Sequence, residues 1–412
     1  MKELELYIHI PFCVQKCHYC DFVSFAGKAD VFDDYVKALC KEMEFYKDRF
    51  SEYRITSVYM GGGTPSVLPS DLILRITDSL YKNFQLTETK EKRKGLFLQK
   101  KIRPTTEFSM ECNPGTVDKT KLTAYKKAGI NRISFGLQSA NDEELQTLGR
   151  IHTYAEFIQC FEDAREAGFD NINVDLMQAL PGQDMKSWQM SLGQVAMWHP
   201  EHISAYSLII EEGTDFHKWM RKGKTLAGEE RNGIFLPDGE VQLLPSEEEE
   251  RDIYYFTKTM LEQSGYKQYE ISNYAVPGFE CVHNIGYWKR KNYLGLGLNA
   301  SSMADNVRWK NTADLTVYLQ DATKAKEPEE HLTHKEQMEE FMFLGLRLRD
   351  GISRTDFVNT FHQDIDLVYG PVLDELYDQG MLTFADDNIK LTDKGVDVSN
   401  KVLAEFLIDQ ES

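Results

Sequence analysis

Residues 4–20 read Leu4-Glu-Leu-Tyr-Ile-His-Ile-Pro-Phe-Cys13-Val-Gln-Lys-Cys17-His-Tyr-Cys20, an apolar run followed by three cysteines. The spacing of these cysteines is C-x3-C-x2-C. The chain has seven cysteines in 412 residues, so chance expects roughly 0.002 copies of a prescribed triple. The apolar run predicts a strand that delivers the three thiols to one short loop.

Cysteine thiolates bind iron–sulfur clusters, and a cubane normally has four of them. Three on one loop, Cys13, Cys17 and Cys20, predict a [4Fe–4S] cluster whose fourth iron is open. An open metal position is typical of a chemical site rather than a structural one. The alternative is a structural zinc knuckle with His9 or His18 as its fourth ligand.

Length and composition favour a soluble protein with a large core and about two domains. The chain is 42% hydrophobic and 27% charged, which is ordinary for a soluble protein. No apolar run approaches the roughly 20 residues of a membrane-spanning helix, and the N-terminus lacks the pattern of a signal peptide. Clustered cysteines favour a reducing compartment, so we expect a cytoplasmic protein. The net charge of −19 argues against nucleic-acid binding.

Short apolar strands alternate with amphipathic helices in the first half, a pattern typical of a parallel α/β sheet. We expect strands near 4–10, 55–60, 106–111, 131–136, 171–176 and 202–209. Ser70 and Thr153 are the predicted N-caps of two of the helices. Six βα units predict a partial (β/α)6 barrel, with its site at the C-terminal ends of the strands.

The pattern predicts three parts: a barrel domain (1–225), a connecting region (226–330) and a C-terminal α+β domain (331–412). The last part has helices and a terminal hairpin, which predict a winged-helix-like module. Residues 335–412 carry seven Lys or Arg against seventeen Asp or Glu, a net charge of −10, which argues against DNA binding. We expect 222–250 to be an exposed connection and 88–104 to be a basic surface loop, in preference to an RNA contact.

Glycines and polar side chains follow the predicted strands. The second strand ends in a glycine ledge and a threonine, and later strand ends carry carboxylates and an amide; the residues are Gly61, Gly62, Gly63, Thr64, Glu111, Gln138 and Asp175. Arg150 follows a short helix nearby. Each singly is more often structural, but together they suit a zwitterionic nucleoside. Glu111 would bind its ammonium group and Arg150 its carboxylate, with Gln138 and Asp175 on ribose hydroxyls.

The cysteine triple and the glycine ledge resemble the radical S-adenosylmethionine (SAM) superfamily, in which SAM binds the open iron and the reduced cluster cleaves it. Within that superfamily, the chain resembles the oxygen-independent coproporphyrinogen III oxidase group. This resemblance implies SAM contacts at Tyr7, Tyr19, Gly62, Gly63, Thr64, Glu111, Gln138, Arg150, Asp175 and, as an apolar adenine contact, Ile209.

Two features separate the branches of this group. The oxidase has a further cysteine two residues after the third one, whereas Cys20 here is followed by Asp21-Phe22. Residues 283–288 (the HNIGYW motif) are similar to the H-N-x-x-Y-W signature of the haem chaperone branch, HemW. The resemblance implies haem binding by His283, Asn284, Tyr287 and Trp288. Histidine is a standard axial ligand of haem; a structural histidine among core aromatics is the alternative.

We therefore expect a haem chaperone that binds a [4Fe–4S] cluster, SAM and haem and delivers haem to respiratory haem proteins. The alternative is oxygen-independent coproporphyrinogen III oxidase, which decarboxylates propionate side chains, so enzymatic activity stays open and no catalytic residue is assigned. A third hypothesis, a redox-sensing winged-helix regulator, is disfavoured by the acidic C-terminal part. A homodimer and peripheral membrane contact are compatible with a carrier that serves respiratory partners.

Overall fold

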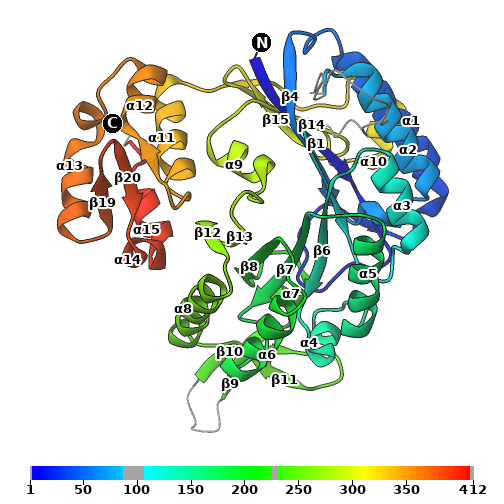
Figure 1. The fold of residues 1–412 in the computed structure, drawn as a ribbon, viewed down its shortest axis with the longest axis horizontal. Helices are drawn as coiled ribbons and strands as arrows, with labels where there is room; N and C mark the ends of the chain where they lie inside the picture. The colour runs from blue at the N-terminus through cyan, green and yellow to red at the C-terminus, as the bar shows by residue number, and fades with distance from the viewer. Residues whose placement is uncertain (1, 87–105, 225–229, 409–412) are drawn as a thin grey trace, which may run out of the picture.

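The computed structural model describes residues 2–86, 106–224 and 230–408. Its centre is a curved sheet with helices on the outer face, and a smaller module stands beside it (Figure 1). The basic loop expected at 88–104 lies outside the described residues.

Six parallel strands form the barrel: β1 (Lys2–Ile10), β4 (Tyr53–Gly62), β5 (Glu107–Cys112), β6 (Arg132–Gln138), β7 (Ile172–Gln178) and β8 (His202–Ser207). Their order in the sheet is β8-β7-β6-β5-β4-β1, with each pair parallel. The predicted partial barrel is therefore confirmed. Parallel strands expose their C-terminal ends at one edge, which is where the polar residues of the sequence pattern are found.

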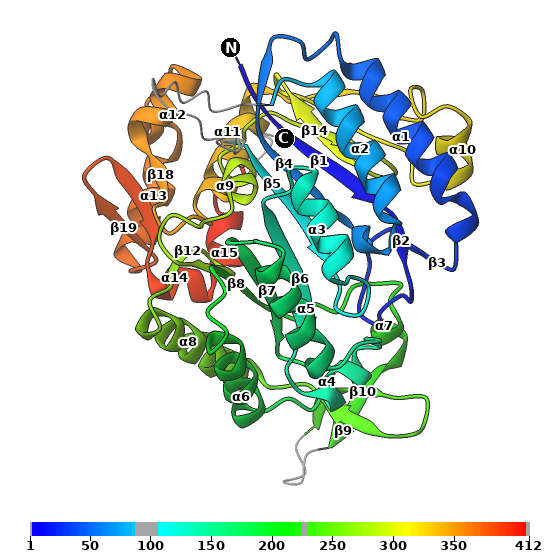
Figure 2. The same ribbon diagram turned by 45° about the vertical axis from the view of Figure 1, so that its right-hand side comes forward.

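Helices cover the outer face of these strands (Figure 2). They are α1 (Phe32–Tyr46), α2 (Ser70–Asn83), α3 (Lys119–Lys127), α4 (Asp142–Thr147), α5 (Tyr154–Glu166) and α6 (Met185–Ala196). Thr153 caps α5 in a capping box with Glu156, as predicted. The prediction for Ser70 was wrong: Pro69, in an extended conformation, is the N-cap, and Ser70 is already helical. No helix in the described ranges has both the length and the apolarity to cross a membrane.

The sheet continues beyond the barrel at both edges. At one edge, β14 (Tyr293–Leu296) lies parallel to β1, followed by β15 (Ser301–Ala304), β16 (Val307–Lys310) and β17 (Glu330–His331). At the other, β13 (Asn273–Ala275) and β12 (Lys267–Glu270) extend from β8. Segments on both sides of residue 226 thus share one sheet, and α10 (Leu315–Gln320) packs on α1. The boundaries at 225 and 330 stay predictions.

The prediction that 222–250 forms an exposed connection between domains was wrong. Three antiparallel strands occupy its first part: β9 (Met220–Lys224), β10 (Glu230–Phe235) and β11 (Val241–Leu243). The acidic run at 247–250 is the first turn of α8 (Glu247–Gln263), which Ser246 caps. Negative side chains stabilise a helix N-terminus through the helix dipole, so a charge run that suggested a linker instead begins a helix.

The C-terminal module has the predicted winged-helix-like order of elements. These are α11 (His334–Gly345), β18 (Ile352–Ser353), α12 (Arg354–Phe361), α13 (Ile365–Asp378), β19 (Leu382–Ala385), β20 (Asn388–Leu391), α14 (Asp393–Asp397) and α15 (Ser399–Ala404). The module has its own core, which includes Met342, Phe357 and Leu373. A short helix, α9 (Val282–Trp288), lies between the barrel and this module (Figure 1).

Candidate functional site

The three cysteines of residues 13–20 line one cleft at the C-terminal edge of the barrel. Strand β1 ends at Ile10, and the two short strands β2 (Phe12–Cys13) and β3 (Phe25–Ala26) pair with each other to close the loop. Cys13, Cys17 and Cys20 are all half-buried. The cleft has a volume of about 730 Å³, counted with its open mouth.

The donor set suits a cluster better than a single ion. Within the described ranges, no three His, Cys, Asp or Glu side chains are close enough together to hold one metal ion. Both ring nitrogens of His9 are engaged, Nδ1 by the Tyr7 hydroxyl (3.0 Å) and Nε2 by the Val23 carbonyl (3.1 Å), and His18 Nδ1 lies 3.3 Å from Asp215. Three thiol side chains around one cleft match the ligand set of an iron–sulfur cluster.

The glycine ledge at the end of β4 brings backbone close to the cysteine loop. The Gly63 amide donates to the Ile10 carbonyl (2.9 Å) and the Thr64 amide to the Phe12 carbonyl (2.7 Å). A Cβ on Gly61 would collide with Glu111, and one on Gly63 would collide with the backbone of residues 10–12. Glycine is therefore required here by space, not only by conformation.

Gly62 combines a left-handed backbone, at φ +109°, with contact against the His9 imidazole. We expect Gly62→Ala to lower the free energy of unfolding by about 1–3 kcal/mol, measured by urea denaturation. Gly168→Ala is the matched control, because Gly168 has φ +89° but open space around a Cβ. A Gly62 effect no larger than that of Gly168 would contradict the steric part of this account.

Glu111 is the buried acid of the cleft. Its carboxylate accepts hydrogen bonds from the Tyr59 hydroxyl (3.0 Å) and the Gly62 amide (3.0 Å). Burial, with a smaller contribution from the nearby Asp175 carboxylate, raises the pKa of Glu111 to about 7. A cationic group entering the cleft would favour the ionised form of this acid.

Arg150 reaches the cleft wall and contacts the cysteine loop. Its guanidinium donates to Asn113 Oδ1 (2.7 Å) and to the Gly136 carbonyl, and Nη1 lies 3.6 Å from Cys17 Sγ. Asn113 in turn donates to Thr64 Oγ1 (2.8 Å), which lies 3.5 Å from Cys13 Sγ. This network aligns a fixed positive charge beside the thiols. Sequence reasoning missed Asn113, although it directly follows β5 and precedes Pro114.

Gln138 and Asp175 also line the cleft. Gln138 has a positive φ of 74° and accepts a hydrogen bond from the Tyr206 hydroxyl (2.9 Å). Asp175 accepts from Ser134 (3.1 Å) and Asn173 (2.7 Å), and burial raises its pKa. Sequence reasoning also missed Tyr206, which comes from the predicted strand β8 but carries no charge or motif to mark it.

The remaining predicted contacts divide into two groups. Tyr19 lines the cleft and packs on a cluster that includes Phe216 and Ile234, so the small β9–β11 sheet supports it. Tyr7 does not line the cleft; it lies behind it, stacked on Tyr59 with 6.4 Å between ring centroids. Ile209 also lies outside the cleft lining, with 69% of its surface exposed.

The HNIGYW motif forms α9, on the inner side of β4. His283 is only 8% exposed. Its Nδ1 lies 3.0 Å from Ser57 Oγ, and its ring stacks on Tyr59 at 5.2 Å. Burial and the Arg132 guanidinium lower the pKa of His283 to about 3. The imidazole is therefore neutral at neutral pH, as an axial ligand must be.

The other motif residues lie nearer the surface. Tyr287 is 42% exposed, and Asn284 and Trp288 are half-buried. The Arg347 guanidinium lies 4.4 Å from the centre of the Trp288 ring, while Trp288 Nε1 is buried without a hydrogen-bond partner in the described structure. None of the four lines the cysteine cleft. A flat porphyrin does not fit against the imidazole of so enclosed a histidine unless neighbouring groups move.

Family models match two parts of the chain. The model of the radical SAM superfamily matches residues 7–194, and the model of the HemN C-terminal domain matches residues 332–398. These ranges coincide with the barrel strands β1 to β7 and with the winged-helix-like module.

Relatives match over nearly the whole chain. Identity is 34% to a protein of Lactococcus lactis, over 99% of this chain and 98% of the relative, and 33% to one of Bacillus subtilis, over 97% and 98%. A protein of Escherichia coli is 32% identical over 99% of both chains. All three bear the name heme chaperone HemW.

A solved structure, that of coproporphyrinogen III oxidase (HemN) from E. coli, superimposes with a TM-score of 0.78. It covers 98% of this chain and 90% of that chain, with 23% sequence identity. At that identity the similarity shows a shared fold and does not extend to activity.

Proposed function

The chain belongs to the heme chaperone HemW family of the radical SAM superfamily, and on this premise we propose that it is a haem chaperone that binds a [4Fe–4S] cluster, SAM and haem. The observation that carries the proposal is the 34% identity over 99% of the chain to a relative of that name. We further propose that it delivers haem to respiratory haem proteins.

Cys13, Cys17 and Cys20 are the proposed cluster ligands, and their half-buried position around one cleft supports this. A [4Fe–4S] cluster there would supply an open iron for SAM and a one-electron reductant. The soft thiolate set suits iron–sulfur chemistry, and the Arg150 guanidinium 3.6 Å from Cys17 Sγ offsets part of the negative charge of the thiolates.

For SAM, we propose that Glu111 binds the ammonium group and Arg150 the carboxylate. The buried carboxylate and the fixed guanidinium support these roles, because each is the charge complement of one end of an amino acid. Gln138 and Asp175 would bind ribose hydroxyls. Tyr19, Gly62, Gly63 and Thr64 would complete the cleft, with Tyr7 behind it, and Ile209 would contact adenine from the rim.

For haem, we propose His283 as the axial ligand, with Asn284, Tyr287 and Trp288 around the macrocycle. The neutral imidazole supports this choice. The enclosure of His283 does not, so haem binding requires a rearrangement of α9.

The setting is also proposed. All seven cysteines are free, which supports a reducing compartment such as the cytoplasm. The charge of −10 on residues 335–412 supports a protein partner over nucleic acid. We also propose a homodimer and peripheral membrane contact, and both rest on the family resemblance alone.

Anaerobic reconstitution with iron and sulfide, followed by haem titration, tests this function. We expect a Soret band that saturates with added haem. The same sample is then incubated with reductant, SAM and coproporphyrinogen III. Formation of vinyl product would overturn the chaperone in favour of the oxidase, and 5′-deoxyadenosine without vinyl product would show that SAM is cleaved by a carrier.

We expect SAM affinity to rise about tenfold between pH 6 and pH 8, because the pKa of Glu111 is raised to about 7 and a pKa near 7 leaves the acid mostly protonated at pH 6 and mostly ionised at pH 8. Only the ionised form attracts an ammonium group. Equilibrium binding of SAM to reconstituted protein measures this. Glu111→Gln should bind more weakly, with a flatter pH profile; an unchanged profile in that variant would assign the titration to another group.

A further inference from the structure

Helix α9 is anchored to the barrel at its N-terminus. The Glu107 carboxylate of β5 accepts hydrogen bonds from the Val282 amide (3.0 Å), the His283 amide (3.3 Å) and the Cys281 thiol (3.4 Å). An acidic side chain at this position satisfies helix N-terminal amides that have no partner within the helix. The first turn of α9 is therefore fixed to the sheet.

The C-terminal end of α9 is held by the winged-helix-like module. Glu340 on α11 is 7% exposed, and its carboxylate accepts from Arg290 Nε (2.8 Å), two residues after the end of α9, and from Arg308 of β16. The Arg347 guanidinium lies over the Trp288 ring. Removal of one partner of a buried charge pair leaves the other charge uncompensated, which strongly destabilises the packing around it.

Beneath the middle of α9 lies a buried carboxyl group, that of Glu5. Glu5 of β1 is fully buried, and neither of its oxygens has a hydrogen bond in the described structure. It lies 3.8 Å from His283 Nδ1 and against Gly286, where a Cβ would overlap it. An unsatisfied buried polar group costs free energy. The described position of α9 includes this free-energy cost of the buried Glu5 carboxyl group. Contact of Glu5 with water would remove the cost.

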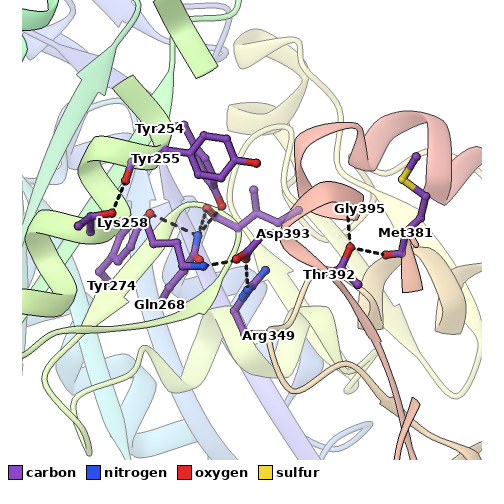
Figure 3. Close-up of polar contacts among 12 residues, drawn as sticks. Tyr254, Tyr255, Lys258, Gln268, Tyr274, Arg349, Met381, Thr392, Asp393 and Gly395 are labelled. Atoms are coloured by element: carbon purple, nitrogen blue, oxygen red, sulfur yellow. Dashed lines mark hydrogen bonds and ion pairs between the residues drawn. The ribbon is translucent and has the colours of Figure 1, made fainter. Parts of the chain in front are cut away.

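A second junction attaches the module to α8 and β12. Asp393 of α14 accepts from Lys258 of α8 (2.7 Å) and, within the module, from Arg349 (2.6 Å) (Figure 3). The Arg349 amide donates to the Tyr269 carbonyl of β12 (2.9 Å). Loss of the Glu340 contacts leaves this junction in place and releases from the module both Arg290, which follows α9, and Arg308 of β16.

Resting on the proposed function, we propose that Glu340 is a positioning residue that holds α9 closed, and that haem reaches His283 only after α9 moves away from β1 and β4. The described conformation is the closed state. If only the open state binds haem, the apparent affinity and the association rate scale with the open fraction. A change that weakens the closed state therefore speeds haem uptake.

Glu340→Gln is the direct test. We expect hydrogen exchange of the amides of residues 282–288, and the association rate of haemin followed at the Soret band, to rise by about tenfold or more. Glu375→Gln is the control, because Glu375 carries the same charge on the exposed side of the module and its carboxylate accepts a hydrogen bond from Gln379 (3.0 Å). A thermal unfolding scan of each variant establishes that the module is folded.

A second pair of variants tests the same closed state from the barrel side. Gly286→Ala places a methyl group into the Glu5 carboxyl and should open α9, with faster exchange and faster haemin association. Adding Glu5→Ala to that variant restores the space and should return both rates toward the wild-type values. An effect of Gly286→Ala that does not pass through the Glu5 contact, such as a change in helix propensity, would not be rescued by Glu5→Ala.

Equal exchange and association rates in wild type, Glu340→Gln and Gly286→Ala would overturn the proposal. So would a Glu340→Gln effect that Glu375→Gln reproduces. If no variant and no wild-type protein binds haemin, the proposed function fails, while exchange at residues 282–288 still decides whether Glu340 holds α9 closed.

Discussion

Cys17→Ser should abolish the iron–sulfur absorbance of anaerobically reconstituted protein and reduce bound iron from about four atoms per chain toward zero. The cluster would have only three protein ligands, so the loss of one leaves two. Cys17 also contacts Arg150, at 3.6 Å from its Nη1, so the substitution removes the sulfur atom that this guanidinium faces. Visible absorption and iron and sulfide analysis measure the result.

Cys40→Ser is the matched control for this experiment. Cys40 is a half-buried thiol on α1, whose Sγ lies 3.8 Å from the Arg75 carbonyl, far from the cysteine loop in the fold. It should retain the full spectrum. Full absorbance in the Cys17→Ser protein, or zinc in place of iron in the wild type, would contradict the cluster and with it the proposed binding of SAM.

His283→Ala should weaken haem binding by at least about tenfold, since even groups that only support a metal ligand contribute 10–100-fold to metal affinity. The cluster spectrum should not change, because His283 does not line the cysteine cleft. Haemin titration and the position of the Soret band measure the first effect, and visible absorption of the reconstituted cluster measures the second.

His283→Gln separates ligation from structure. A glutamine side chain preserves a polar partner for Ser57 Oγ, which lies 3.0 Å from His283 Nδ1, but does not replace an imidazole at iron. We expect it to bind haem as weakly as the alanine variant and to unfold closer to the wild-type temperature. Unchanged haem affinity in both variants would remove His283 from the account.

The sequence was informative where a period or a spacing is fixed by physics. Buried parallel strands are short apolar runs between amphipathic helices, so all six barrel strands were predicted. The cysteine spacing, the glycine ledge and strand-end residues such as Glu111 and Gln138 then placed the cleft, because parallel strands end at one edge.

Other features depend on contacts that no local pattern encodes. Strand β14 was missed because Gly295 interrupts its apolar alternation; the structure places the Ser301 backbone where a Cβ would be. The Glu247–Glu250 run resembles a solvated linker in sequence, but it is the first turn of α8, whose N-cap is Ser246. Ile209 was placed by family resemblance alone, and its exposure follows from the chain leaving the sheet at Ser207. The enclosure of His283 results from contacts with three strands distant in sequence: β1 through Glu5, β4 through Ser57 and β5 through Glu107.

Tyr59 contacts residues of both proposed sites. Its hydroxyl donates to Glu111 in the cleft, while its ring supports His283 in α9. A ligand that draws Glu111 toward itself therefore weakens one restraint on the ring against which the histidine packs. Linkage of this kind is reciprocal, so we expect cargo affinity to depend on whether the nucleoside is bound, and nucleoside affinity to depend equally on the cargo.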